Sequence, residues 1–152
     1  MTVEGFLNRA KGISNIIFLG VLAPYLKGNK NLLLIEQRIT ELFKGSNHSE
    51  QSAIAKCMPD LMSFFKEPEK IIKRIFESMG GLEDQLQVGQ SYLAAGLLKG
   101  IGAKETIKYL DIIISSEYVS KTKSEKTGRC SLLNAFIDNF GRVVELRIIQ
   151  II

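Results

Sequence analysis

One apolar pattern recurs four times along this chain, at intervals close to the length of two helices. Each copy has three apolar residues at positions i, i+4 and i+8, which lie on one face of an α-helix. The copies begin at positions 18, 57, 93 and 132, so the intervals between them are nearly equal. The copies are Phe18, Leu22 and Leu26; Cys57, Leu61 and Phe65; Leu93, Leu97 and Ile101; and Leu132, Phe136 and Phe140. We interpret the pattern as an internal repeat.

The rest of the chain also predicts helices, because apolar residues recur at intervals of three and four and do not alternate strictly with polar ones. Glycine and asparagine residues, which commonly end helices, separate the segments. The polar run 117–127 is the longest interval between paired helices. The expected helices cover 4–26, 31–44, 49–65, 68–79, 84–101, 104–116 and 128–140, and another begins in 143–152.

The helices between the four copies carry a matching pattern. Its members are Ile35, Ile39 and Phe43 in one helix and Ile71, Ile75 and Met79 in the next, displaced by the same interval as the second and third copies. Two helices in roughly 36–39 residues are the size of a helical-repeat unit, which buries its apolar face by stacking on its neighbours. A compact seven-helix bundle with accidental spacing is the alternative.

We therefore expect an all-α fold, an α-α superhelix of the HEAT-repeat kind with about three to four helix pairs. The approximate units are 1–26 (partial), 31–65, 68–101, 104–141 and 143–152 (the start of the next). The first unit resembles a second helix without its partner, and the last ends in an apolar run. We accordingly expect a segment of a longer array that is truncated at both ends.

Residues with catalytic or metal-binding chemistry are few. One histidine and two cysteines cannot supply a four-ligand structural zinc site. His48 lies in a polar, turn-like stretch, whereas Cys57 and Cys130 lie on or beside apolar stripes, so we expect a surface histidine and two buried thiols. Lys99–Lys104 lacks the Gly-Lys-Ser/Thr ending of a phosphate loop. We expect no enzyme, no cofactor and no metal site.

The apolar run Ile13–Leu26 follows two basic residues and so resembles the core of a signal peptide. The run is too short to span a bilayer, Ser14 and Asn15 dilute it, and no clear small-residue cleavage site follows. We favour a buried helix here. With 24% charged residues, 45% hydrophobic residues and two cysteines, we expect a globular cytoplasmic protein without a membrane partner.

A net charge of +4 favours an acidic partner. Four basic residues gather in the polar interval before the helix at 128, namely Lys121, Lys123, Lys126 and Arg129. A flexible basic loop is a candidate contact for RNA phosphates, independent of base sequence and sensitive to salt. A solvated loop without a ligand is the alternative. A second basic cluster, around Lys70, interleaves with glutamates and is typical of a solvated helix face.

Three stretches resemble, in order, segments of one protein family. They are Gly12–Leu26, Ser52–Met62 and Ser91–Gly102, of which Leu97–Gly102 is the most specific part. The family is the general-control translational activator, a very large cytoplasmic HEAT-repeat protein. The resemblance covers roughly residues 12–141, within the region that is similar to fungal elongation factor three.

The resemblance implies a non-catalytic scaffold that binds ribosomes and works with an ATP-binding-cassette partner protein. It also implies a role in activating the kinase that phosphorylates the alpha subunit of initiation factor two when amino acids are scarce. The expected partners are ribosomal RNA or protein, with the cassette protein and the kinase engaged through the full-length protein, and no DNA. The alternative is a generic HEAT scaffold, of the transport-receptor or phosphatase type, that binds proteins on its concave face.

Overall fold

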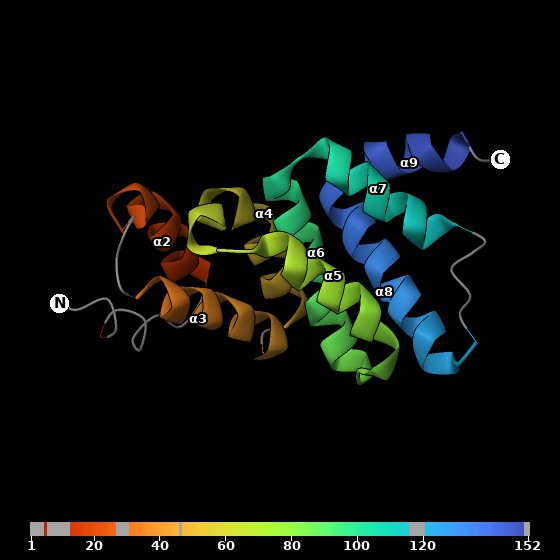
Figure 1. Cartoon of the computed structure of the whole chain (residues 1–152), viewed down its shortest axis with the longest axis horizontal. Coiled ribbons are helices and arrows are strands. Elements are labelled where there is room, and N and C mark those ends of the chain that lie inside the picture. Colours follow the sequence, from red (N-terminus) through yellow and green to blue (C-terminus); the bar gives the residue numbers. More distant parts are fainter. Residues whose placement is uncertain (1–4, 6–12, 27–30, 46, 116–120, 151–152) are drawn as a thin grey trace.

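A computed structural model describes residues 5, 13–26, 31–45, 47–115 and 121–150 (Figure 1). Within these ranges the chain forms eight α-helices, two short 3-10 helices and no strand, which confirms the predicted all-α class. The α-helices are α2 (Ile13–Leu26), α3 (Leu32–Gly45), α4 (His48–Leu61), α5 (Pro68–Ser78), α6 (Asp84–Ile101), α7 (Ala103–Ile114), α8 (Lys123–Phe140) and α9 (Arg142–Ile149). The 3-10 helices η1 (Met62–Phe64) and η2 (Met79–Gly81) extend α4 and α5.

The helices alternate between two positions in the fold. We call α3, α5, α7 and α9 the first helices, and α2, α4, α6 and α8 the second helices. The second helices pack on one another in order, α2 on α4, α4 on α6 and α6 on α8. Figure 1 shows this row running along the long axis of the molecule, with α6 near its middle. The first helices α3, α5 and α7 also pack against α6.

Helix α6 forms the centre of the core. Its residues 91–98 are all buried, because α4 covers one side of the helix and α8 the other. The repeated stripe accounts for much of this core, since Leu61, Leu93 and Leu97 are fully buried. Burial of such side chains is the main favourable contribution to folding.

The stripe is displaced in the first copy. Phe18 is 46% exposed, and α2 instead buries Ile16, Leu19 and Ala23. Helix α2 packs mainly on α4 and therefore buries one face. Helices α4 and α6 each have second helices on two sides, so they bury more of their circumference. The predicted periodicity therefore identified the helix but placed its buried face one position too early.

Helix α8 begins earlier than the sequence pattern predicts, at Lys123 instead of position 128. A capping box fixes this start: Oγ1 of Thr122 accepts from the N–H of Glu125, and the Glu125 carboxylate accepts from the N–H of Thr122. The prediction that residues 123–127 belong to a loop between helices is wrong, because these residues form the first turns of α8. Positions 116–120, the other part of that interval, lie outside the described residues.

Among the residues that the structure describes, no helix is both long enough and apolar enough to cross a membrane. The remaining part of the expected helix at 4–26, residues 6–12, lies outside the described ranges.

Candidate functional site: repeated helix contacts, a lysine segment and a polar cluster

A buried glutamine joins the two helices of two successive pairs. Nε2 of Gln51, in α4, donates a 2.9 Å hydrogen bond to the carbonyl of Phe43 near the end of α3. Nε2 of Gln87, in α6, donates a 2.9 Å hydrogen bond to the carbonyl of Met79 just after α5. Each glutamine comes eight residues after the residue whose carbonyl it binds, and both side chains are buried. The Gln51 bond reaches a carbonyl in the last turn of α3, and the Gln87 bond adds to the long one that the Met79 carbonyl accepts from the N–H of Leu82, at 3.3 Å.

A glycine of the following second helix completes each contact. Gly89 in α6 lies against the Phe43 carbonyl and the Gln51 amide, and Gly128 in α8 lies against Met79 and the Gln87 amide. A Cβ atom at Gly128 would come within 2.6 Å of Cγ of Met79, which is too close for any real side chain. A three-part contact of carbonyl, glutamine and glycine therefore occurs twice, with the partners displaced by one repeat. The two differ in one respect, because Gly89 meets the carbonyl of Phe43 whereas Gly128 meets the side chain of Met79.

The third helix pair uses an arginine in place of the glutamine. Nε of Arg129 donates a 2.7 Å hydrogen bond to the carbonyl of Ile113, and Nη2 donates a 3.0 Å bond to the carbonyl of Ser115. Arg129 is half-buried and holds the end of α7 against α8. The structure thus separates Arg129 from the three lysines with which the sequence grouped it.

Lys121, Lys123 and Lys126 remain exposed at the start of α8. None of the three forms an ion pair with a residue that the structure describes. The Glu125 carboxylate accepts hydrogen bonds from the backbone N–H groups of Thr122 and Lys121, and these bonds lower the pKa of Glu125. We call residues 121–126 the lysine segment, which the capping box holds in a defined helical start.

Lysines at a helix N-terminus are unfavourable, because the helix dipole places partial positive charge there. Glu125 offsets this cost by supplying a carboxylate to the free backbone N–H groups. The arrangement of the lysine side chains is that expected of a surface that attracts anions.

A polar cluster that the sequence did not predict joins three second helices. Ser52 of α4 donates a hydrogen bond to the Asp138 carboxylate of α8, and Nζ of Lys56 lies 3.4 Å from Oδ1 of Asp138. The hydroxyl of Tyr92, in α6 between them, lies 2.9 Å from Nε2 of His48. The imidazole meets the Tyr92 ring edge-on, with a centroid distance of 5.1 Å.

The ionisation of this cluster is fixed by its surroundings. Burial raises the pKa of Tyr92 to about 12, with a further contribution from the Asp138 charge. The hydrogen bond from Ser52 lowers the pKa of Asp138, as does the nearby Lys56 ammonium. The tyrosine is therefore neutral and the aspartate ionised at physiological pH. His48 contacts the tyrosine and not Ser52, so the cluster contains no serine–histidine pair of the kind that activates a nucleophile.

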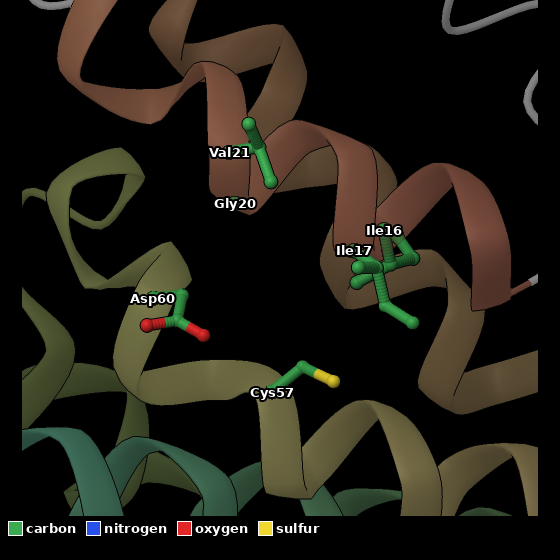
Figure 2. Close-up of a pocket in the computed structure, with 6 residues that line it drawn as sticks. All are labelled: Ile16, Ile17, Gly20, Val21, Cys57 and Asp60. Atoms are coloured by element: carbon green, nitrogen blue, oxygen red, sulfur yellow. The ribbon is translucent and has the colours of Figure 1, made fainter.

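An open groove of about 280 Å³ lies along the contact between α2 and α4. Figure 2 shows Cys57 and Asp60 of α4 facing Gly20 and Val21 of α2 across it. Burial raises the pKa of the Cys57 thiol, and the Asp60 charge adds to this effect while Lys99 opposes it. The thiol is therefore protonated near neutral pH and is a weak nucleophile.

The prediction of two buried thiols is wrong. Cys57 is half-buried at the groove, and Cys130 is exposed on a face of α8 that no described helix covers. The prediction of a surface histidine is correct for His48, although it is the first residue of α4 and not a loop residue. No group of three His, Cys, Asp or Glu side chains within the described ranges is placed to hold a metal ion.

Comparison of the chain with protein-family models, with curated proteins and with solved structures found no match. Function is therefore inferred from the residues and contacts of the chain itself.

Proposed function

We propose that this chain is a non-catalytic scaffold, a segment of a HEAT-repeat solenoid whose lysine segment binds ribosomal RNA. The observation that supports the solenoid is the three-part contact of carbonyl, glutamine and glycine. It occurs at Phe43, Gln51 and Gly89 and again at Met79, Gln87 and Gly128. Each member is displaced by the interval that separates the corresponding copies of the sequence repeat. A chance bundle has no reason to reproduce such a contact in register.

The helix ends support the same interpretation. Gly102 follows α6 and Gly141 follows α8, and both have positive φ angles, of 130° and 27°. The two glycines are separated by the same interval as the third and fourth copies of the stripe. Each donates its N–H to the carbonyl four residues earlier, that of Leu98 or Ile137. Helix α9 therefore follows α8 as α7 follows α6, which supports the assignment of 142–149 to the start of a further pair.

The first helices are joined by side-chain contacts of their own. The rings of Phe76 in α5 and Tyr109 in α7 lie 4.7 Å apart, centroid to centroid. Arg147 in α9 binds Asp111 in α7 through two hydrogen bonds, of 2.6 and 2.7 Å. A row of second helices packed in order, with side-chain contacts from α5 to α7 and from α7 to α9 beside it, is compatible with a helical-repeat scaffold.

The lysine segment supports an RNA partner. Three exposed ammonium groups on one rigid helix start provide sequence-independent attraction to phosphates. Together with the resemblance to the general-control translational activator, this points to the ribosome. The cassette partner and the initiation-factor kinase would then be engaged by the full-length protein, and the role of this segment would be to hold the lysines in place.

The test is co-sedimentation of the chain with purified ribosomes across a salt series. The variant carries Lys121→Ala, Lys123→Ala and Lys126→Ala, and we expect it to pellet less and to lose about one unit of salt slope per lysine. The matched control removes the same charge from the α5 region, through Lys66→Ala, Lys70→Ala and Lys73→Ala. Equal loss in both variants, or pelleting that does not respond to salt, would contradict the proposal.

Arg129 is left out of this test because its guanidinium binds the end of α7. Replacing Arg129 would disturb the fold, so a loss of ribosome binding could not be distinguished from a loss of structure.

The second candidate function is a scaffold that binds proteins. The groove between α2 and α4 favours it, because apolar residues line the α2 side and Asp60 provides one charge. Such binding would be driven by apolar burial, so it would persist as salt is raised. Salt dependence of partner capture therefore separates the two candidates.

A further inference from the structure

A second cavity lies at the boundary between two helix pairs, where the end of α6 and the start of α7 meet the end of α8 and the start of α9. It is open and has a volume of about 150 Å³. Its lining residues are Lys99, Gly102, Ala103, Thr106, Phe140 and Val143. The boundary one repeat earlier contains η1, whose Met62 packs against Gly100 of α6. Helix α8 instead passes into α9 across Gly141 alone, which leaves the later boundary partly open.

The walls of this cavity are apolar. The ring of Phe140 packs on that of Phe136, with a centroid distance of 5.4 Å, so this wall is held in place. The Thr106 hydroxyl is already hydrogen-bonded to the carbonyls of Leu98 and Gly102, at 3.3 and 2.9 Å. An apolar cavity of this size takes a group about as large as benzene. The side chain of valine, leucine or isoleucine therefore fits, whereas the acyl chain of a lipid does not.

One cation stands beside these walls. Lys99 is exposed and forms no ion pair with a residue that the structure describes. Glu105, the acidic residue in the first turn of α7, pairs with Lys108 of its own helix at 3.3 Å. The Lys99 ammonium is thus available to an anion. The α7 dipole adds partial positive charge at the same place, because Gly102 and Ala103 begin that helix.

Apolar walls beside a positive charge select the chemistry of the occupant. The side chains of aspartate and glutamate supply a carboxylate without an apolar group beside it. The last residue of a protein supplies both when it is valine, leucine or isoleucine, because its carboxylate and its apolar side chain are attached to the same carbon. Capture of a terminal carboxylate is a recurring mode of peptide recognition.

We propose that this cavity binds the C-terminus of a partner protein that ends in valine, leucine or isoleucine. The terminal carboxylate then lies against the Lys99 ammonium and the first turn of α7, and the last side chain occupies the space beside Phe140 and Val143. Both helix pairs that form the cavity lie within the described chain, so the site is complete without further repeats. This inference does not rest on RNA binding by the lysine segment.

The test is a nuclear magnetic resonance titration of the ¹⁵N-labelled chain with short peptides. The probe is N-acetyl-Gly-Ser-Gly-Leu with a free carboxylate, and the same peptide with a C-terminal amide is compared with it. We expect the free acid to shift the backbone signals of Ala103, Thr106 and Val143. The amide should bind about tenfold more weakly, because it cannot form the charge-assisted contact with Lys99. A peptide that ends in lysine should not bind.

Two variants test the two parts of the site separately. Lys99→Ala should abolish the preference for the acid over the amide. Its matched control is Lys104→Ala, since Lys104 is also exposed and without an ion pair to a described residue, but does not line the cavity. Ala103→Leu places a side chain in the cavity and should abolish binding of both peptides, with the helical circular dichroism unchanged.

Three outcomes overturn the proposal. The first is the absence of shifts at peptide concentrations up to the millimolar range. The second is equal binding of the acid and the amide. The third is a preference for the acid that Lys99→Ala and Lys104→Ala reduce equally, because the carboxylate would then respond to net charge and not to this cavity.

Discussion

Single buried polar residues decide how the helix pairs are joined. Gln87 shows this most clearly, because its Nε2 donates to the carbonyl of Met79 at 2.9 Å and to the carbonyl and the hydroxyl of Ser124 at 3.0 Å. Its Oε1 is buried without a hydrogen-bond partner among the described residues. The net contribution of this amide is therefore the gain from its donor bonds less the cost of the buried, unsatisfied Oε1.

Replacing Gln87 by alanine should therefore destabilise the fold. The change leaves the carbonyls of Met79 and Ser124 buried without this donor, and we expect a loss of about 1–3 kcal/mol in the free energy of unfolding. Urea unfolding followed by circular dichroism measures it. Gln85→Ala, at an exposed position two residues earlier in α6, should change stability by less than about 0.5 kcal/mol. Equal effects at the two positions would show that Gln87 is not a structural link.

Tyr92 should ionise only at strongly alkaline pH, well above the ordinary range of a tyrosine side chain. Its pKa is raised from 10.0 to about 12 by burial and by the Asp138 charge. Between these values the unfolded chain has already lost the tyrosine proton that the folded chain keeps, so stability falls as pH rises through this window. Ultraviolet titration of tyrosinate measures the ionisation. Tyr92→Phe should remove the component of the titration near pH 12, and persistence of that component in the variant would contradict this assignment.

At the scale of helices, glycines set how closely neighbouring elements approach. Gly89→Ala places a methyl group against the backbone carbonyl of Phe43, which cannot move aside as a flexible side chain does. We expect a loss of stability of about 1–3 kcal/mol or more, because α6 must separate from the end of α3. The measurement is again the free energy of unfolding in urea.

Gly45→Ala is the control for this prediction. Gly45 is also helical, lies at the end of α3, and has open space where an added Cβ atom would lie, with no neighbouring atom within 4 Å. Alanine there should leave stability unchanged or raise it by up to about 1 kcal/mol, through the lower backbone entropy of the unfolded chain. A loss of stability in Gly45→Ala as large as that in Gly89→Ala would show that the close approach of Gly89 to the Phe43 carbonyl is not the cause, because alanine is the better helix former at both positions.

Helix positions were largely predictable from the sequence, because the apolar stripes are long and regular. The start of α8 was missed since residues 123–127 carry no apolar stripe, and polarity alone predicted a loop. A local signal was present: Thr122 and Glu125 have the spacing of a capping box. The glutamine contacts also had a signal, because Gln51 and Gln87 are separated by the same interval as the second and third copies of the apolar pattern.

At the scale of the whole molecule, the polar cluster joins two second helices, α4 and α8, that are not neighbours in the row. Repeats in a straight array contact only their nearest neighbours. Here Ser52 of α4 reaches Asp138 of α8, two helices away, over the edge of α6 at Tyr92. The sequence could not predict this contact, because the partners lie 86 residues apart at polar positions without periodicity. The packing of both α4 and α8 on α6 brings them together.

The two-row arrangement also predicts how stability is distributed along the chain. Helix α6 buries much of its length between α4 and α8, whereas α9 buries only Val144 of its described residues. In native-state hydrogen exchange at low protein concentration, we therefore expect the slowest exchange in α6, intermediate rates in α4 and α8, and the fastest in α2 and α9. Uniform protection from α2 to α9 at low concentration would instead indicate a single cooperative unit, because a linear array opens first at its ends.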